Sequence, residues 1–168
     1  MPQTPCPLAT DSTFFCTVRL QDRRSDLLVR EMNRLRNATR TALTACPFRI
    51  DDIVVLPNAI HTIWTLPAGD ADVSRRWGLL KAQFSRGLPA PAHRHPASVR
   101  NGDKGIWQRR YWAHRLTDLE DIAAHRHLIY CAPVQVGLVT DPRHWPHTSL
   151  HRALRAGTWT VPQASAAA

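Results

Sequence analysis

The alternation of apolar and polar positions along the chain predicts four β-strands. Short runs rich in β-branched and aromatic residues cover residues 12–20, 48–56 and 60–66, and a less regular run covers residues 106–116. Runs of this length and composition are typical of strands in a packed sheet. The turn-forming Pro57-Asn58-Ala59 lies between the second and third runs, so we expect these two strands to form a tight antiparallel pair.

Apolar residues spaced three and four apart predict two amphipathic helices between these strands. The first is expected from Ser25, which would cap it, to the residue before Pro47. The second is expected over about residues 73–84, with Asp72 or Ser74 as its cap. Both helices would bury one face against the predicted sheet.

The fold class follows from a third helix and from the order of the elements. A capping box at Thr117 and Glu120 predicts a helix that ends near Cys131, ahead of Pro133. The order is then β-α-β-β-α-β-α, and the first six elements match the ferredoxin-like split βαβ arrangement. The predicted fold is therefore mixed α/β, of the α+β kind, with an antiparallel sheet and helices mainly on one face.

The length of the chain, 168 residues, suits one domain. Residues 1–11 contain three prolines and are expected to be a flexible leader, residues 12–160 to form one domain, and residues 161–168 to be a disordered tail. Between the second helix and the fourth strand, residues 85–105 are rich in Pro, Gly, His and Arg. We expect this segment to be a basic, mobile loop.

The chain is strongly basic. Lys and Arg number 22 and Asp and Glu number 13, which gives a net charge of +9 at pH 7. Such an excess favours a polyanionic partner, nucleic acid before a membrane surface. No apolar run reaches the roughly 18 residues that span a bilayer. The four cysteines form no Cys-x-x-Cys pair, so neither a disulfide framework nor a structural zinc site is expected, and the cytoplasm is the expected location.

One stretch is more specific than any of these patterns. Residues 54–67, VVLPNAIHTIWTLP, resemble the signature of the REP-associated tyrosine transposases, which are single-tyrosine HUH nucleases. Four further segments agree with the same family in sequence and in order: residues 13–25, 69–77, 106–114 and 133–146. The resemblance covers residues 12–160, nearly the whole chain.

The resemblance implies a catalytic centre made of four groups. A His-x-His pair on a strand and a Gln or Asn on the last helix would hold a divalent ion, magnesium or manganese, that polarises a phosphate in single-stranded DNA. A tyrosine four residues before the polar ligand would attack phosphorus and form a 5′-phosphotyrosine. The implied activity is DNA transposition by nicking at short palindromic hairpins. The implied location is the bacterial nucleoid, with a monomer and a homodimer both open.

Only one of these four groups is present in this sequence. The His-x-His pair falls on Ala59 and His61, and the nucleophile and polar ligand fall on Leu128 and Ala132 when the helix is aligned on Pro133. Leucine has no nucleophilic atom, alanine has no lone pair, and one imidazole is a weak site for a hard cation. The hypothesis is a degenerate family member that binds single-stranded or hairpin DNA without cleaving it and holds no divalent metal tightly.

An alternative is an active transposase that uses other residues. Tyr130 lies two residues after Leu128, but a step of two along a helix turns the side chain by about 200°, toward the opposite face. His125 and His127 lie near the same face as Leu128, and either could meet His61 in space. The alternative therefore uses Tyr130 as nucleophile or recruits these histidines.

Basic and aromatic residues remain to hold DNA whether or not the chain cleaves it. Trp107 and Trp112 could stack unpaired bases, although at least one aromatic residue of this segment must face the core if it forms a strand. His93 and His95 form a second His-x-His pair, for which a place in the solvated basic loop is the simpler interpretation. The expected DNA contacts are Arg23, Arg24, Arg75, Arg76, Lys81, Trp107, Arg109, Arg110, Trp112 and Arg152.

Overall fold

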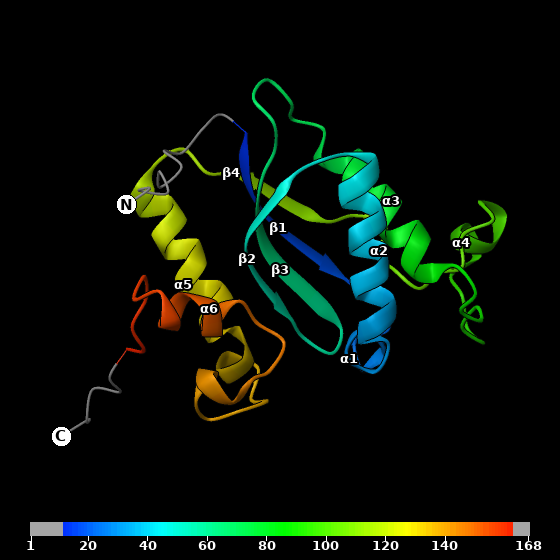
Figure 1. The fold of residues 1–168 in the computed structure, drawn as a ribbon. Helices are drawn as coiled ribbons and strands as arrows, with labels where there is room; N and C mark the ends of the chain where they lie inside the picture. Colours follow the sequence, from blue (N-terminus) through cyan, green and yellow to red (C-terminus); the bar gives the residue numbers. More distant parts are fainter. Residues whose placement is uncertain (1–11, 163–168) are drawn as a thin grey trace.

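The structure is a computed structural model that describes residues 12–162. The predicted leader, residues 1–11, and residues 163–168 of the predicted tail lie outside this part. The elements, of which all but η1 are labelled in Figure 1, are in chain order β1 (Thr13–Arg19), α1 (Leu27–Arg30), α2 (Met32–Ala45), β2 (Arg49–Val55), β3 (Ala59–Thr65), α3 (Val73–Ser85), α4 (Pro96–Arg100), β4 (Trp112–Arg115), α5 (Leu119–Gln135), the 3-10 helix η1 (Pro142–His144) and α6 (Leu150–Arg155).

The four strands form one antiparallel sheet in the order β2-β3-β1-β4. β3 pairs antiparallel with both β1 and β2, so β1 and β2 run in the same direction with β3 between them. This is the split βαβ arrangement that the sequence predicts. The predicted mixed α/β class with an antiparallel sheet is therefore confirmed.

Helices cover both faces of the sheet (Figure 1). On one face lie α2 and α3, and the rings of Trp64 on β3 and Trp77 on α3 stack there with their centroids 4.1 Å apart. On the other face lie α5 and α6, where Ile63, Ile129 and Leu150 share a second buried cluster. The sequence placed the helices mainly on one face; the structure adds this second layer. We call the side of the sheet covered by α5 the α5 face.

The helix α5 is longer than predicted and starts at a different cap. The side chain of Asp118, not Thr117, accepts a hydrogen bond from the backbone N–H of Asp121 at 2.8 Å. The helix also continues past Pro133, where the sequence predicted its end. Proline lacks the N–H that would bond four residues back, and in this helix Pro133 is buried together with Ala132.

Smaller differences occur at the ends of the other elements. The first predicted helix is divided at Glu31 into α1 and α2. The predicted fourth strand is reduced to β4, and of its first half only an isolated bridge between Leu20 and Trp107 remains. The predicted loop over residues 85–105 contains the short helix α4.

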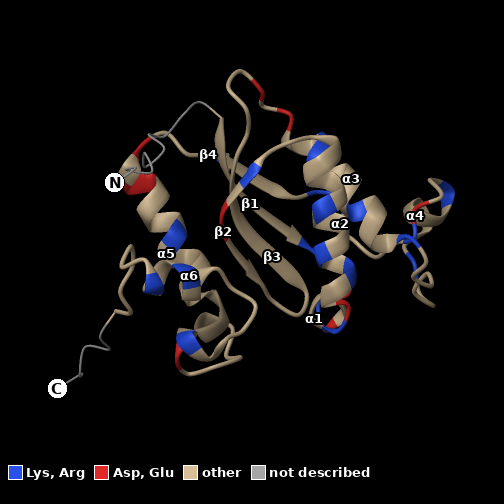
Figure 2. Cartoon of the chain, viewed as in Figure 1, with Lys and Arg blue, Asp and Glu red and all other residues tan. Residues whose placement is uncertain are grey.

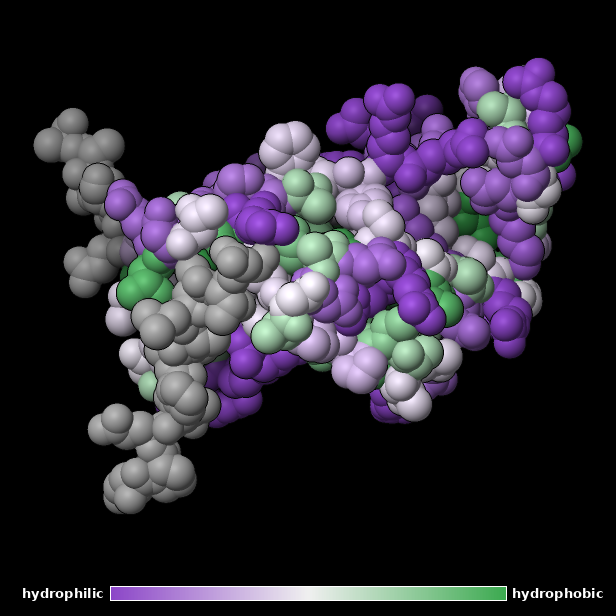
Figure 3. Space-filling model, turned by 90° about the horizontal axis from the view of Figure 1, so that it is seen from above, coloured by the Kyte–Doolittle hydropathy of each residue, from purple (hydrophilic) through white to green (hydrophobic). Residues whose placement is uncertain are grey.

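The side of the molecule seen in Figure 3 is largely hydrophilic, with hydrophobic residues scattered among polar ones. Within residues 12–162, no helix is both long enough and apolar enough to cross a bilayer. Among the large hydrophobic side chains of the described residues, Trp112 is the most exposed, at 63%. A tryptophan that is this open to solvent is a candidate contact for a partner.

Candidate functional site

Two rows of side chains cross the sheet on the α5 face. Residues directly opposite one another in antiparallel strands project to the same side. The helix α5 packs over the β2 and β3 part of these rows, and β4 forms their outer end. The register gives the first row as Asp52, Ile63, Phe15 and His114, and the second as Val54, His61, Thr17 and Trp112.

His61 lies in the middle of the second row. Its Nδ1 atom is 2.7 Å from the hydroxyl oxygen of Thr17, and the residue is only 8% exposed. Burial, with a smaller effect from the positive charge of Arg19, lowers the pKa of His61 to about 4. The imidazole is therefore neutral at pH 7. The ring of Phe15 stacks beside it with the centroids 6.3 Å apart.

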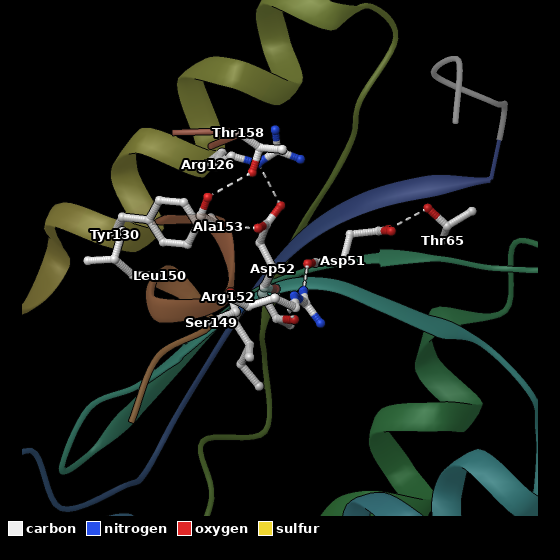
Figure 4. Close-up of polar contacts among 12 residues, drawn as sticks. Asp51, Asp52, Thr65, Arg126, Tyr130, Ser149, Leu150, Arg152, Ala153 and Thr158 are labelled. Atoms are coloured by element: carbon white, nitrogen blue, oxygen red, sulfur yellow. Dashed lines mark hydrogen bonds and ion pairs between the residues drawn. The ribbon is translucent and has the colours of Figure 1, made fainter. Parts of the chain in front are cut away.

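A buried carboxylate fixes the position of α5 over the sheet. Asp52, which is 3% exposed, accepts a hydrogen bond from the Tyr130 hydroxyl and pairs with Nε of Arg126 at 2.9 Å (Figure 4). A buried charge is unfavourable without such partners, so these contacts determine which side of α5 meets the sheet. Ala132 then lies in the buried cluster, and Leu128 lies at the rim with 36% exposure.

A basic and aromatic surface borders His61 where β1 ends. The backbone N–H of Gln21 donates to the carbonyl of Ile106, and the N–H of Gln108 donates to the carbonyl of Arg19, both at 2.9 Å. These bonds place the segment leading to β4 beside the end of β1. The exposed residues that border this junction, named here the basic edge, are Arg19, Arg23, Arg24, Arg109, Arg110 and Trp112.

Positive charge is not confined to the basic edge. Figure 2 shows Lys and Arg also on α2, α3 and α5, and acidic residues on β2, beside α1, in the loop before α3 and at the start of α5. The basic edge differs from these surfaces because it combines exposed arginines with an exposed tryptophan in the same row as His61. Arginines can neutralise phosphates and an open indole can stack a base.

Comparison with known proteins identifies the family. No family model matches the chain. It is 38% identical over 149 residues to the REP-associated tyrosine transposase of Escherichia coli, covering 89% of this chain and 82% of that protein. A Haemophilus influenzae relative named for the same family is 36% identical over 144 residues, covering 85% of this chain and 82% of the relative. The chain belongs to the REP-associated tyrosine transposase family.

A solved structure agrees with this assignment. It is described as a REP-associated tyrosine transposase bound to a REP hairpin, and it superposes on this chain with a TM-score of 0.76 at 36% identity. The superposition covers 95% of this chain and 89% of that one. The resemblance found in the sequence is therefore confirmed at the level of the family and of the fold.

The positions that the resemblance gives to the family's metal ligands do not fit a divalent ion in this transposase homologue. Ala59 and Ala132 are buried in one apolar cluster, and each offers only a methyl group. His61 remains, with its Nδ1 hydrogen-bonded to Thr17, and it offers an ion at most one nitrogen. Magnesium and manganese bind mainly through several oxygen ligands, and these positions supply none.

The alternative nucleophile of the transposase, Tyr130, points into the core. It is 1% exposed, and its hydroxyl donates to the Asp52 carboxylate (Figure 4). Burial and the neighbouring carboxylate raise the pKa of Tyr130 well above its usual value. A tyrosine that attacks DNA needs an accessible oxygen, and the oxygen of Tyr130 has neither access nor a tendency to ionise. These contacts argue against the alternative that uses it.

Two residues that the sequence assigned to DNA contact are buried, and those two expectations are corrected. Arg76 is 3% exposed, and its Nη2 donates to Oδ2 of Asp70 at 2.7 Å and to the carbonyl of Pro47 at 2.8 Å. Trp107 is 7% exposed and packs edge-on against the ring of Phe84, with the centroids 5.3 Å apart. Residue type alone favoured DNA contact, but both side chains belong to the interior.

The other predicted DNA contacts divide between surfaces. Five of them belong to the basic edge. Lys81 is half-buried and donates to the backbone carbonyl of Gln108 at 3.1 Å, so it supports the segment that carries the basic edge. Arg75 is exposed on α3, and Arg152 is exposed on α6, where it donates to the carbonyl of Asp51. The predicted set is therefore not one continuous surface.

The histidines that the sequence singled out lie in different places. His93 and His95 are exposed, and Nδ1 of His95 accepts a hydrogen bond from the backbone N–H of Ala97 at the start of α4. His127 is exposed on α5, with its Nε2 3.6 Å from the sulfur of Cys131. His125 faces the sheet and packs on an aromatic ring of β1.

Sequence reasoning missed three residues on or beside the α5 face. Arg19 is exposed beside the imidazole, and strand alternation could have placed it there because it lies two residues after Thr17. His114 and Asp121 were not considered either, yet they meet His125 at the start of α5. The spacing of four between Asp121 and His125 was a signal, whereas the approach of His114 depends on strand register.

Proposed function

We propose that this family member binds REP-type hairpin DNA without nicking it. The observation that carries the proposal is the residue at the nucleophile position, Leu128, which stands at the rim of α5 in a fold that is otherwise that of the family. The fold that would hold DNA is retained, while the side chain that would carry the attacking oxygen is replaced by the hydrocarbon side chain of leucine.

Hairpin binding is supported by the relative and by the basic edge. A solved family structure that covers 95% of this chain is described as bound to a REP hairpin. The exposed arginines of the basic edge can each release counterions from a phosphate, and Trp112 can stack an unpaired base next to a stem. The net charge of +9 supplies long-range attraction for the same partner.

The absence of nicking is supported by the chemistry of the replaced positions. Covalent cleavage needs a hydroxyl that attacks phosphorus and groups that stabilise the developing charge. Leu128 offers no hydroxyl, and Ala59 and Ala132 offer no ligand atoms. Removing a nucleophile abolishes the covalent route but leaves binding and positioning in place.

The test compares the native chain with the triple variant Ala59→His, Leu128→Tyr, Ala132→Asn. Each is mixed with single-stranded DNA that carries a REP-type hairpin of the source genome, in magnesium or manganese. We expect both chains to shift the DNA in a gel and only the variant to give a cleaved product attached to protein. Cleavage by the native chain would contradict the proposal, and failure of the variant to cleave would contradict the assignment of the three positions.

Two controls separate the parts of this proposal. A DNA of the same length with a scrambled stem should bind more weakly; equal binding would rule out recognition of the hairpin. Any cleavage by the native chain should be repeated with Tyr130→Phe. Loss of that cleavage would establish Tyr130 as the nucleophile and replace our proposal with the active-transposase alternative.

A further inference from the structure

We propose that His114, Asp121 and His125 form a binding site for a zinc-class divalent transition-metal ion. His114 lies on the edge strand β4, and Asp121 and His125 lie one helical turn apart near the start of α5. The site goes beyond the proposed DNA binding and does not depend on it. It uses none of the positions that the family resemblance assigns to a metal.

The three side chains already lie close together. Nε2 of His114 is 3.0 Å from Oδ2 of Asp121, and Nδ1 of His125 is 3.1 Å from Oδ1 of the same carboxylate. Taking one ligand atom from each residue, all three atoms lie within 4.8 Å of one another. Ligand atoms around a tetrahedral zinc are about 3.3 Å apart, given bonds of about 2.0–2.1 Å. Small side-chain rotations therefore suffice to enclose an ion.

The donor set selects the kind of ion. Two imidazole nitrogens with one carboxylate oxygen are typical of zinc and related transition metals, whereas magnesium and calcium take mostly oxygen. Three protein ligands leave a fourth position for water. The side chains of His114, Asp121 and His125 are 43%, 23% and 21% exposed, so an ion has access from solvent.

Neighbouring groups hold the rings in place. Nδ1 of His125 is 2.8 Å from the backbone carbonyl oxygen of Asp121. A carbonyl oxygen only accepts, so Nδ1 donates to it in the metal-free protein. This bond must give way when Nδ1, the nitrogen that lies beside Oδ1 of Asp121, binds an ion. The rings of Phe15 and His114 pack against His125 with centroid distances of 4.6 Å and 5.2 Å.

An ion at this place would tie the edge strand to the helix. In the described part of the chain, β4 has a partner strand on one side only, and its residue Trp112 belongs to the basic edge. The unfolded chain does not hold the three ligands together, so binding to the folded form should stabilise it. The site would thereby restrain the strand that presents the exposed tryptophan.

The experiment uses the full chain without an affinity tag, stripped with a chelator. Zinc is titrated by calorimetry and cobalt by visible absorption, which reports the coordination geometry. We expect one ion per chain, a cobalt spectrum of a four- or five-coordinate site, and a rise in Tm with zinc. His114→Gln, Asp121→Asn and His125→Gln should each weaken binding at least tenfold, with folding checked by circular dichroism.

Matched variants make the assignment specific. His93→Gln removes an exposed histidine elsewhere and should leave the affinity unchanged. Absence of zinc and cobalt binding to the native chain would overturn the proposal. So would binding that survives His114→Gln and Asp121→Asn but is lost in His61→Gln or in the double variant His127→Gln, Cys131→Ala, because the ion would then lie at another site.

Discussion

The hydroxyl of Tyr130 donates a hydrogen bond to the carboxylate of Asp52, a residue 78 positions earlier in the chain. This bond joins the middle of α5 to the edge strand β2 and makes the tyrosine part of the interior. Arg126 completes the arrangement from the preceding turn of the helix. Tyr130, although it lies two residues from the position that the resemblance assigns to the nucleophile, therefore has a structural role.

Tyr130→Phe should destabilise the protein and leave hairpin binding unchanged. The substitution removes one partner of a buried carboxylate, which costs about 1–3 kcal/mol. Urea unfolding measures the loss. Tyr111→Phe is the matched control. The hydroxyl of Tyr111 is hydrogen-bonded to Ser74 at an exposed position, so its removal should lower the free energy of unfolding much less. Equal losses in the two variants, or weaker DNA binding by Tyr130→Phe, would contradict this role.

Acid should destabilise the protein through His61. The folded-state pKa of His61 is about 4, against 6.5 for the free group. Above pH 6.5 both states are neutral at this residue. As the pH falls toward 4, the imidazole binds a proton in the unfolded state but stays mostly neutral in the folded state, so the free energy of unfolding falls. The contribution reaches about 3 kcal/mol near pH 4.

The pH profile of His61→Gln tests that assignment. Between pH 6.5 and 4, the free energy of unfolding of this variant should depend less on pH than that of the native chain. His93→Gln, which removes an exposed imidazole, should keep the native slope. Parallel profiles for the native chain and His61→Gln would show that His61 titrates normally in the folded state.

Trp112→Ala should weaken binding to DNA that carries unpaired bases beside the stem. Stacking on an aromatic side chain contributes about 1–3 kcal/mol per base, or about 5- to 150-fold in Kd. Leu119→Ala is the control, because Leu119 is also exposed, at 56%, but lies outside the basic edge. A fully paired duplex should not respond to either substitution, and a similar loss on duplex would exclude stacking.

Arg19→Gln and Arg109→Gln should each reduce the salt dependence of hairpin binding. A protein that loses one contact to a single-strand phosphate shows a slope of log K against log salt that is shallower by about 0.7. Arg49→Gln is the control, since Arg49 lies on the opposite edge strand and pairs with Asp51 at 2.6 Å. An unchanged slope in both basic-edge variants would place the DNA elsewhere.

Local sequence patterns predicted the sheet and its hairpin, because alternation and the Pro57-Asn58 turn act over a few residues. They failed where contacts between residues far apart in the sequence determine the local structure. α5 continues past Pro133, which is buried within the helix although it lacks the N–H of a helical hydrogen bond. Its cap is Asp118 and not Thr117, a choice between adjacent side chains that depends on the backbone leading into the helix.

The site was predicted to the same limited extent. The resemblance assigned the catalytic positions to Ala59, His61, Leu128 and Ala132 from two short segments, and this assignment stays a prediction. Arg76 and Trp107 were misassigned because charge and aromaticity do not reveal burial. The approach of His114 to Asp121 depends on how β4 registers with β1 and how α5 is turned, and neither is encoded in a short segment.

The contacts that hold α5 to Asp52 have a consequence for how such a protein can evolve. The groups that hold the helix, Tyr130 and Arg126, are different from the residues at positions 128 and 132, to which the sequence resemblance assigns the nucleophile and a metal ligand. The residues that hold α5 in place and the positions assigned to catalysis therefore lie on different sides of this helix. On the function proposed here, a few substitutions on one side of α5 would abolish cleavage of DNA while leaving the fold that binds it intact.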